Sequence, residues 1–533
     1  MTFDLVIRNA TVVDGTGLPS FRSDIAVKDG RITVIDALLK NATAPQDIDA
    51  SGKVVAPGFV DIHTHSDVSL LRPGAGINKV CQGVTTEVTG NCGFSAFPLA
   101  HERLPLHYDH LAYLGRDEAD LTWRDFAGYA EVMNNARPIQ NVACLVGHGT
   151  LRIAAAGLLA DAYHGQTRDL LCRLLEESLE QGAFGFTTGL TYVPSRFASA
   201  EEITDLARIA ARYSAIYATH SRAAAGQERA ALEEAVEVGR ESGVRVEYSH
   251  LALNDPRTWG TASELLALFD AAWEDGTDIR FDVYPYDASA SSVAQYLPIW
   301  LQTAGPQESH KLLSDPLTRS RALRELASGW YGGIPWIWER VLVTQSGPED
   351  AETPGHTLAE LAESSGLEPT EVLLLLYERY GNAVQVAMFY RTEGDMKEFL
   401  SHAASAVGSD GLAMAADALS ERPHPRFYGT YPRILGRYVR EVGLLSLEEA
   451  VRKMTGEPAD RCGLTTRGYI RQGYAADIVV FSPDDVADRA TFLEPNLLPS
   501  GIDTVVVNGA VVVKRGQWNG TSAGRVLRHG TSE

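Results

Sequence analysis

Residues 54–65 read VVAPGFVDIHTH, an apolar run that is broken by Pro-Gly and ends in His-x-His. Side chains two residues apart on a strand point to the same side, so His63 and His65 can offer two imidazoles to one ion. A hydrogen-bonded pair of surface histidines is the competing interpretation, and the strand of buried type before the motif favours the metal. Active sites of α/β barrels lie where strands end, so the motif predicts a metal site at the end of a first barrel strand.

Strand and helix patterns alternate through the middle of the chain. Helical spacing is followed by a short apolar run four times, at residues 169–181 and 184–187, 201–212 and 215–218, 229–241 and 244–248, and 261–273 and 279–283. Units of about 30 residues predict a parallel α/β architecture, with a TIM-like (β/α)8 barrel as the leading form. A doubly wound open sheet gives a similar local pattern and stays an alternative.

Both ends of the chain are instead rich in short strands. Asp29 and Gly30 separate two apolar runs near the N-terminus, and Asn508 and Gly509 separate two more near the C-terminus. A lone hairpin is only marginally stable, so we expect residues 1–56 and 465–533 to form one small β-sandwich domain. The barrel then covers residues 57–464. The stretch around 284–345 is long for one barrel connection and predicts an insertion that covers the substrate.

The composition disfavours two classes of partner. Lys and Arg number 47 and Asp and Glu 69, so the formal net charge is −22, which argues against binding to nucleic acid or to a membrane surface. The five cysteines are too few and scattered for a disulfide framework. The N-terminus lacks a basic region followed by an apolar stretch, and no run of about 18 apolar residues occurs. We therefore expect a cytoplasmic protein, while its oligomeric state has no signature in the sequence.

Four further side chains are candidate ligands. His220 and His250 each end a predicted strand, one strand–helix unit apart, which would place them at the same mouth of a barrel. Cys92, in GVTTEVTGNCGFS (residues 83–95), is either a soft zinc ligand or a small buried cysteine. Asp410, in AVGSDG (residues 406–411), is either a ligand and general base or part of a glycine turn. His148 is a weaker candidate for contact with a substrate.

Taken in order along the chain, these motifs resemble the N-acyl-D-amino-acid deacylases, or D-aminoacylases, of the amidohydrolase superfamily. The resemblance rests on residues 57–67, 83–95, 219–220, 249–250, 408–411, 423–426 and 429–440. It implies a barrel with a small β domain, one tight zinc and a second, weaker metal position. The tight position would use Cys92, His220 and His250, and the weaker one His63, His65 and Asp410. Residues 142–152 contain no lysine, which agrees with a subtype that uses the cysteine instead of a carboxylated lysine.

Two departures from the family pattern concern the substrate. Ala252 stands where the family usually has a lysine thought to meet the substrate carboxylate, and residues 223–225 are alanines where an acidic residue is usual. Losing the cationic partner of a buried carboxylate typically costs a few kcal/mol. Other side chains that could contact the substrate are Tyr192, Arg222, Tyr284, Tyr286 and Arg426.

The resulting hypothesis is a zinc-dependent hydrolase of a C–N amide bond other than a peptide bond, most simply one that deacylates an N-acyl-D-amino acid. Zinc would lower the pKa of its bound water, and Asp410 would accept the proton as the resulting hydroxide attacks the small-molecule amide. One alternative is an amidohydrolase that acts on a cyclic amide or a peptide-like natural product without the usual free carboxylate. An alternative of another class is a non-catalytic metal-binding scaffold.

Overall fold

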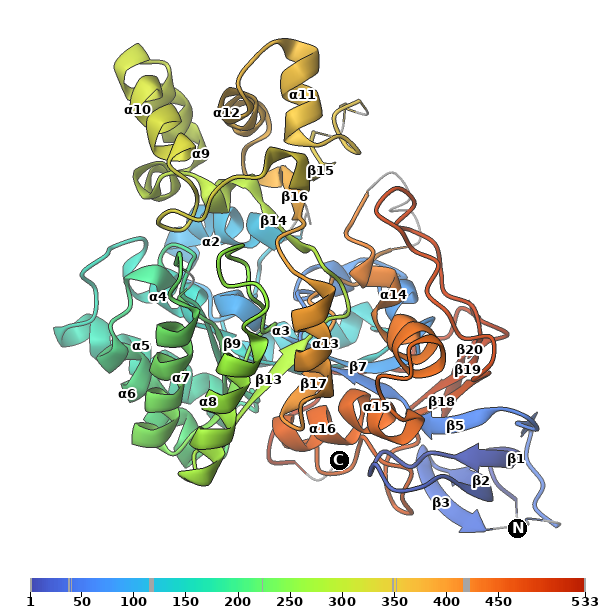
Figure 1. Cartoon of the computed structure of the whole chain (residues 1–533). Helices are drawn as coiled ribbons and strands as arrows, with labels where there is room; N and C mark the ends of the chain where they lie inside the picture. Colours follow the sequence, from blue (N-terminus) through green and yellow to red (C-terminus); the bar gives the residue numbers. More distant parts are fainter. Residues whose placement is uncertain are drawn as a thin grey trace.

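The computed structural model describes residues 2–36, 39, 41–114, 119–222, 224–347, 349–350, 352–415 and 422–531. Its centre is a ring of parallel strands that form two sheets, ordered β6-β7-β8 and β9-β10-β11-β12-β13-β17 (Figure 1). Their bounds are β6 (Phe59–Asp61), β7 (Val84–Thr89), β8 (Asn141–Cys144), β9 (Val146–Gly147), β10 (Gly185–Gly189), β11 (Ile216–His220), β12 (Arg245–Tyr248), β13 (Ile279–Val283) and β17 (Ser405–Val407).

Contacts just beyond the first and last of these strands close the ring. The Asp410 amide donates to the His63 carbonyl over 2.8 Å, and the His65 amide donates to the Gly411 carbonyl over 3.0 Å. On the other side, the Leu145 amide between β8 and β9 donates to the Thr89 carbonyl at the end of β7. An open doubly wound sheet would leave its first and last strands apart, so the chain forms the predicted (β/α)8 barrel.

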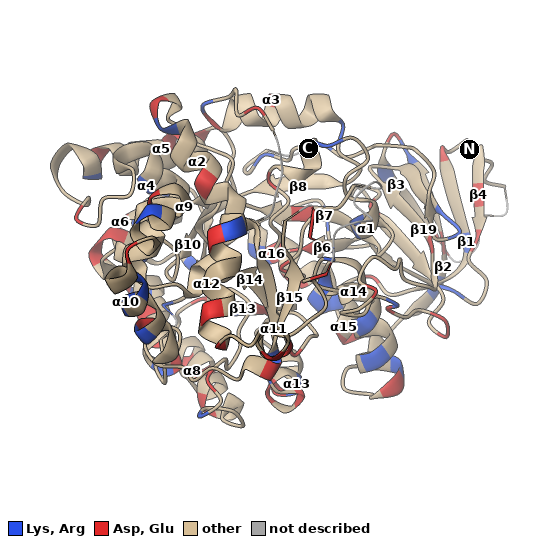
Figure 2. Cartoon of the chain, turned by 90° about the horizontal axis from the view of Figure 1, so that it is seen from above, with Lys and Arg blue, Asp and Glu red and all other residues tan. Residues whose placement is uncertain are grey.

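Helices surround the barrel and bury one face against it. They include α3 (Phe126–Ala136), α4 (His148–Ala156), α5 (Gly165–Glu180), α6 (Ala200–Arg212), α7 (Glu228–Ser242), α8 (Ala262–Glu274), α13 (Glu393–Ser401), α15 (Leu447–Met454) and α16 (Gly456–Cys462). In α6 the Ser199 hydroxyl caps the Glu202 amide, and Ile203, Leu206 and Ala210 form the buried stripe. The charged residues of both signs are spread over the outer helices, such as α6, α10 and α15 (Figure 2).

The two ends of the chain share one sheet, at the lower right of Figure 1. It contains β1 (Leu5–Val12), β2 (Phe21–Lys28), β3 (Arg31–Asp36), β4 (Gln46–Asp49), β5 (Val54–Pro57), β18 (Ile478–Phe481), β19 (Ile502–Val507), β20 (Ala510–Lys514) and β21 (Gln517–Trp518). Strand β5 joins the two groups because it pairs with both β1 and β18. Only Gly58 separates β5 from β6, and a Cβ atom at this residue would lie 2.2 Å from the Thr85 side chain. The sheet therefore runs directly into the first barrel strand.

A separate unit is inserted between β13 and β17, at the top of Figure 1. It contains β14 (Ser289–Ser292), α9 (Ile299–Leu313), α10 (Pro316–Ala327), β15 (Val341–Gln345), α11 (Leu358–Ser365), α12 (Pro369–Tyr380) and β16 (Gln385–Met388), and it has its own apolar core. The sequence suggested an end near residue 345. The unit continues to residue 388 because β16 is the central strand of the order β14-β16-β15.

The remaining short helices lie near the strand ends or follow the last barrel strand. They are α1 (Ile77–Val80), α2 (Leu104–Leu111), α14 (Arg426–Arg433) and the π-helix Ile434–Glu441. Within the described ranges, none of the helices has both the length and the apolar character that crossing a bilayer requires.

Candidate metal centre and substrate cavity

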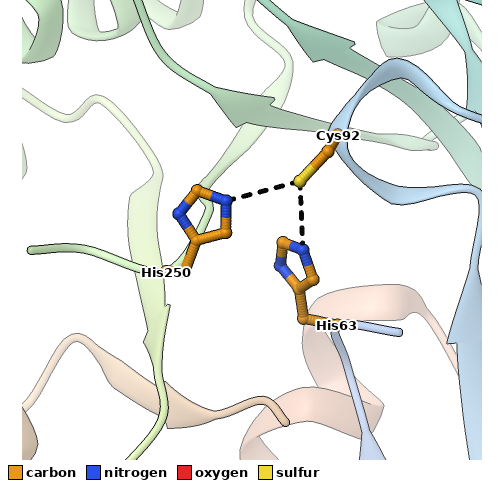
Figure 3. Close-up of side chains that lie close together, drawn as sticks. All are labelled: His63, Cys92 and His250. Carbon is orange, nitrogen blue, oxygen red and sulfur yellow. Dashed lines mark hydrogen bonds between the residues drawn. The ribbon is translucent and has the colours of Figure 1, made fainter. Parts of the chain in front are cut away.

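Five of the six predicted ligands gather at the carboxyl ends of the barrel strands. The Cys92 sulfur lies 3.3 Å from Nε2 of His63 and 3.3 Å from Nε2 of His250 (Figure 3). Asp410 Oδ1 lies 2.9 Å from Nε2 of His65 and 3.7 Å from Nε2 of His63. Two sets of donor atoms result, each with all atoms within 4.8 Å of one another, and His63 belongs to both. Such a spacing lets one ion contact every atom of a set.

His220, the sixth predicted ligand, lies beside these sets. It is the last residue of β11, and its ring centroid lies 4.7 Å from that of His250. Its Nε2 is 2.8 Å from the Thr191 hydroxyl, and its buried Nδ1 has no hydrogen-bond partner among the described residues. The sequence grouped His220 with Cys92 and His250, and His220 also interacts with the Cys92 thiol, while the His63 ring centroid lies 5.0 Å from that of His250.

Three of the clustered residues have a strained backbone. Cys92, His250 and Asp410 have φ of 53°, 39° and 48°, a left-handed region that costs a residue with a side chain roughly 1–2 kcal/mol. Neighbouring polar groups hold these conformations. Asn91 donates to three backbone carbonyls beside the Cys92 loop, and Asp282 accepts the His250 amide over 3.0 Å. The strain is consistent with a site whose side chains are positioned in advance.

Asp282 was not predicted from the sequence, yet it orients two of the ligands. One of its carboxylate oxygens lies 3.1 Å from Nδ1 of His63 and the other accepts the His250 amide. With Nδ1 of His63 occupied, its Nε2 faces the Cys92 sulfur. Carboxylates behind ligating histidines commonly fix the ring orientation in metal sites. An acidic residue inside the apolar strand at residues 279–283 is the signal that could have identified it.

The charges of the cluster favour the deprotonated forms of Cys92 and Asp410, which are the forms that bind a metal ion. Burial alone would raise the pKa of Cys92, but the His63 and His250 imidazoles bring it well below its ordinary value. Burial likewise opposes ionisation of Asp410, whereas Arg426 at 3.0 Å and the histidines hold the pKa of its carboxyl well below the usual range. The same attraction raises the pKa values of His63 and His65 despite their burial, so a metal ion would displace their protons as it binds beside the thiolate and the carboxylate.

The cluster opens into a cavity of about 180 Å³. The inserted unit contributes an aromatic wall of Tyr296, Trp330 and Tyr331, whose ring centroids are 5.0–5.7 Å apart. Ala252 also lines the cavity, where the family pattern would place a lysine. Residue 223, the first of the three alanines that depart from the family pattern, lies outside the described part of the chain.

Four of the six residues proposed for substrate contact line this cavity, namely Tyr192, Arg222, Tyr284 and Arg426. Two do not. His148 begins α4 with no exposed surface, and its ring nitrogens lie 3.0 Å from the Ser195 hydroxyl and the Glu202 carboxylate. Tyr286 is buried beneath Arg433, with its hydroxyl on the Pro425 carbonyl. Both side chains therefore have structural partners away from the cavity.

Two arginines of the cavity differ in whether a carboxylate of the protein already pairs with their guanidinium group. Arg222 pairs with the Glu234 carboxylate and donates to two backbone carbonyls, so it contributes to packing more than to binding. Arg391, which the sequence analysis missed, lines the cavity and is half-buried. Its Nε donates to Asn254 over 3.3 Å and its guanidinium stacks on Tyr284, but no described carboxylate forms an ion pair with it. Arg391 thus offers a cation to a bound anion.

Comparisons with known proteins identify the family of the chain. Residues 46–513 match the model of the family described as Amidohydrolase family. The chain is 38% identical to a D-aminoacylase of Alcaligenes xylosoxydans xylosoxydans, covering 98% of this chain and 97% of the relative. It is 35% identical to an N-acyl-D-glutamate deacylase of the same organism, covering 99% and 97%.

Solved structures show the same similarity over the whole chain. An N-acyl-D-glutamate deacylase from Bordetella bronchiseptica, complexed with zinc and a phosphonate that mimics the tetrahedral intermediate, has a TM-score of 0.84 at 36% identity. A D-aminoacylase described as having a binuclear metal centre has a TM-score of 0.81 at 36% identity. Each match covers 99% of this chain and 100% of the other.

Proposed function

Because the chain belongs to the amidohydrolase family, we propose that it is a metal-dependent hydrolase that removes the acyl group from an N-acyl-D-amino acid. This membership confirms the resemblance that the sequence motifs indicated. The observation that carries the proposal is the convergence of Cys92, His63, His250 and Asp410, from four separate barrel strands, beside a cavity of about 180 Å³. A scaffold with a purely structural metal would not need a cavity beside its ligands.

The donor set fits zinc. A thiolate, imidazoles and a carboxylate are the ligands that zinc accepts in proteins. We assign Cys92, His220 and His250 to a tight position, and His63, His65 and Asp410 to a weaker one. The Cys92 sulfur is equally far from His63 and His250, which supports a thiolate able to contact an ion in either position.

Zinc would supply a Lewis acid that polarises the amide carbonyl and lowers the pKa of a nearby water. Asp410 would accept a proton from the attacking water and pass it to the amine nitrogen as the C–N bond breaks, leaving a carboxylic acid and a free amine. The Tyr284 hydroxyl is buried without a hydrogen-bond partner among the described residues, and Tyr284 lines the cavity. It would donate to an oxygen of the bound substrate.

Arg391→Ala is expected to raise KM for an N-acyl-D-amino acid about 10- to 100-fold with a smaller effect on kcat. A hydrogen bond to a charged group contributes about 1.5–3 kcal/mol, and Arg391 lines the cavity without a carboxylate partner among the described residues. Steady-state kinetics on a substrate and on its carboxamide analogue measure the effect. The carboxamide should lose little, because it carries no negative charge.

Arg222→Ala is the matched control for that variant, since Arg222 lines the same cavity but is occupied by Glu234. We expect this variant to lower the melting temperature and to change KM little. Equal KM effects of the two variants, or an equal loss on the carboxamide, would remove Arg391 from the carboxylate-binding role.

A substrate panel tests the proposed function itself. Zinc-loaded protein should hydrolyse N-acetyl-D-amino acids in preference to their L-enantiomers, lose the activity on chelation and regain it with zinc. Cyclic amides and peptide amides belong in the same panel, because Ala252 at the cavity wall keeps substrates without a free carboxylate as the second candidate. Hydrolysis of those compounds alone would move the assignment to the second candidate, and no hydrolysis at all would contradict both.

A further inference from the structure

The seam between the first and last barrel strands is held by side chains as much as by the backbone. Strands β6 and β17 belong to separate sheets, and the residues just beyond them share the two backbone hydrogen bonds described above. Asp410, the proposed base, lies directly at this seam. Its position therefore depends on what fixes residues 409–414 against the His63 strand.

A fully buried lysine spans the seam. Lys79, from α1, donates to Asp61 Oδ2 over 2.8 Å and to the Ser409 hydroxyl over 2.7 Å. The other oxygen of Asp61 accepts the Ser409 amide over 2.9 Å. None of the three side chains has exposed surface. Asp61 precedes His63 by two residues and Ser409 directly precedes Asp410, so this network joins the ligand strand to the proposed base.

Neighbouring groups continue the same attachment. Asn78, beside Lys79 on α1, accepts the Met414 amide over 2.8 Å and donates to the Leu412 carbonyl over 2.9 Å. The Ser66 hydroxyl, just after the ligand strand, accepts the Ala413 amide over 2.8 Å. Residues 409–414 are thus attached to the N-terminal segment at nearly every position.

Asp410 needs such support because its own backbone is unfavourable. Its φ of 48° costs roughly 1–2 kcal/mol for a residue with a side chain, and such a conformation persists only where its surroundings enforce it. Lys79 and Asp61 fix the preceding residue through both its amide and its hydroxyl. Without them, Asp410 could relax toward an ordinary conformation and turn its carboxylate away from His65.

We propose that Lys79 is a positioning residue, which holds Asp410 in its reactive place across the barrel seam without touching the cavity. The role of Asp410 as a base rests on the proposed function, whereas the attachment of residues 409–414 through Lys79 does not. Lys79 pairs with the buried Asp61 and lies 3.7 Å from the buried Glu87. Because removing one partner of a buried ion pair is destabilising by itself, the test has to separate positioning from stability.

The test compares Lys79→Met with Lys453→Met. Lys453 is also fully buried, and it binds the Ser405 hydroxyl and the Ser405 and His402 carbonyls at the opposite end of β17. Both variants should lose stability. Only Lys79→Met should lower kcat, by about 100-fold with little change in KM, because a small misplacement of a reacting group has this magnitude of effect. In the metal-free protein, only Lys79→Met should speed amide hydrogen exchange at residues 409–413.

A milder variant keeps the proposal testable if Lys79→Met does not fold. Ser409→Ala removes one acceptor of Lys79 and the acceptor of the Gly411 amide, and leaves the pair of Lys79 with Asp61. Exchange is therefore read at Asp410, whose amide donates to His63, and should rise there by a smaller factor. Equal kcat and equal exchange at residues 409–413 in the Lys79 and Lys453 variants would overturn the inference, as would wild-type exchange in Ser409→Ala. The exchange measurement decides the matter even if the wild-type protein hydrolyses none of the panel.

Discussion

Replacing Asp410 by asparagine lowers kcat by about three decades while the protein stays folded, because a positioned acid–base group typically contributes about 10²–10⁴-fold. Asparagine keeps the size of the side chain but cannot take the proton of the attacking water. Burial raises the pKa of Asp410, but Arg426 and the histidines lower it further than burial raises it. Asp410 is therefore a carboxylate at neutral pH in the parent protein. Steady-state kinetics at equal metal content measure the loss.

Asp488→Asn is the control that matches this variant most closely. Asp488 pairs with Arg433 over 2.9 Å, and Arg433 stacks on Tyr286, as Arg426 pairs with Asp410 and stacks on Tyr284. The two sites differ in that Asp488 does not line the cavity. We expect Asp488→Asn to retain kcat. Near-normal turnover in Asp410→Asn would remove Asp410 from the role of base.

Replacing Cys92 by alanine should remove the tightly held metal and, with it, the hydrolysis. Its sulfur lies 3.3 Å from imidazole nitrogens of two ligands, so its loss opens the centre of the cluster. Loss of a residue that only orients a ligand costs about 10- to 100-fold in metal affinity, and loss of the thiolate itself should cost more. Metal analysis after dialysis and activity with added zinc measure the two effects.

Cys462→Ala controls for the removal of a buried thiol. Cys462 is fully buried at the end of α16 and packs among apolar side chains away from the cavity. Its variant should keep both the metal and the activity. Full metal occupancy in Cys92→Ala would contradict the ligand assignment, whatever its activity.

Much of the fold could be predicted from local sequence patterns. Helical spacing and β-rich ends are properties of neighbouring residues, and residues 201–212 were placed as a helix that the structure gives as Ala200–Arg212. Closure of the barrel was not decidable in this way. It depends on contacts between His63 and Asp410, which are far apart in the chain, and the strand–helix repeat is the same in an open sheet.

The site was predictable where a ligand follows a strand closely. His63, His65, Cys92, His250 and Asp410 lie two to four residues beyond the ends of their strands, and parallel strands bring these ends together. His63 and His65 were expected on the strand itself, but β6 already ends at Asp61. His148 also follows a strand, but it opens α4 and turns into the layer between helix and barrel, toward Glu202. Strand position alone does not distinguish these two directions.

The positions and partners of Arg391 and Lys79 could not be predicted from the sequence. Arg391 lies just beyond the inserted unit, in a segment without a motif, and reaches the cavity only because that unit folds back over the barrel. Lys79 gains its partners from Asp61 and from Ser409, which is distant in the chain. Neither residue has a local pattern that signals its partners.

Zinc K-edge absorption spectroscopy of the purified, zinc-loaded protein tests the shared metal centre most directly. One sulfur at about 2.3 Å with imidazole nitrogens at about 2.0–2.1 Å is the expected environment, and the sulfur should vanish in Cys92→Ala. A wild-type spectrum with nitrogen and oxygen neighbours alone, or a protein that retains no zinc, would contradict the account.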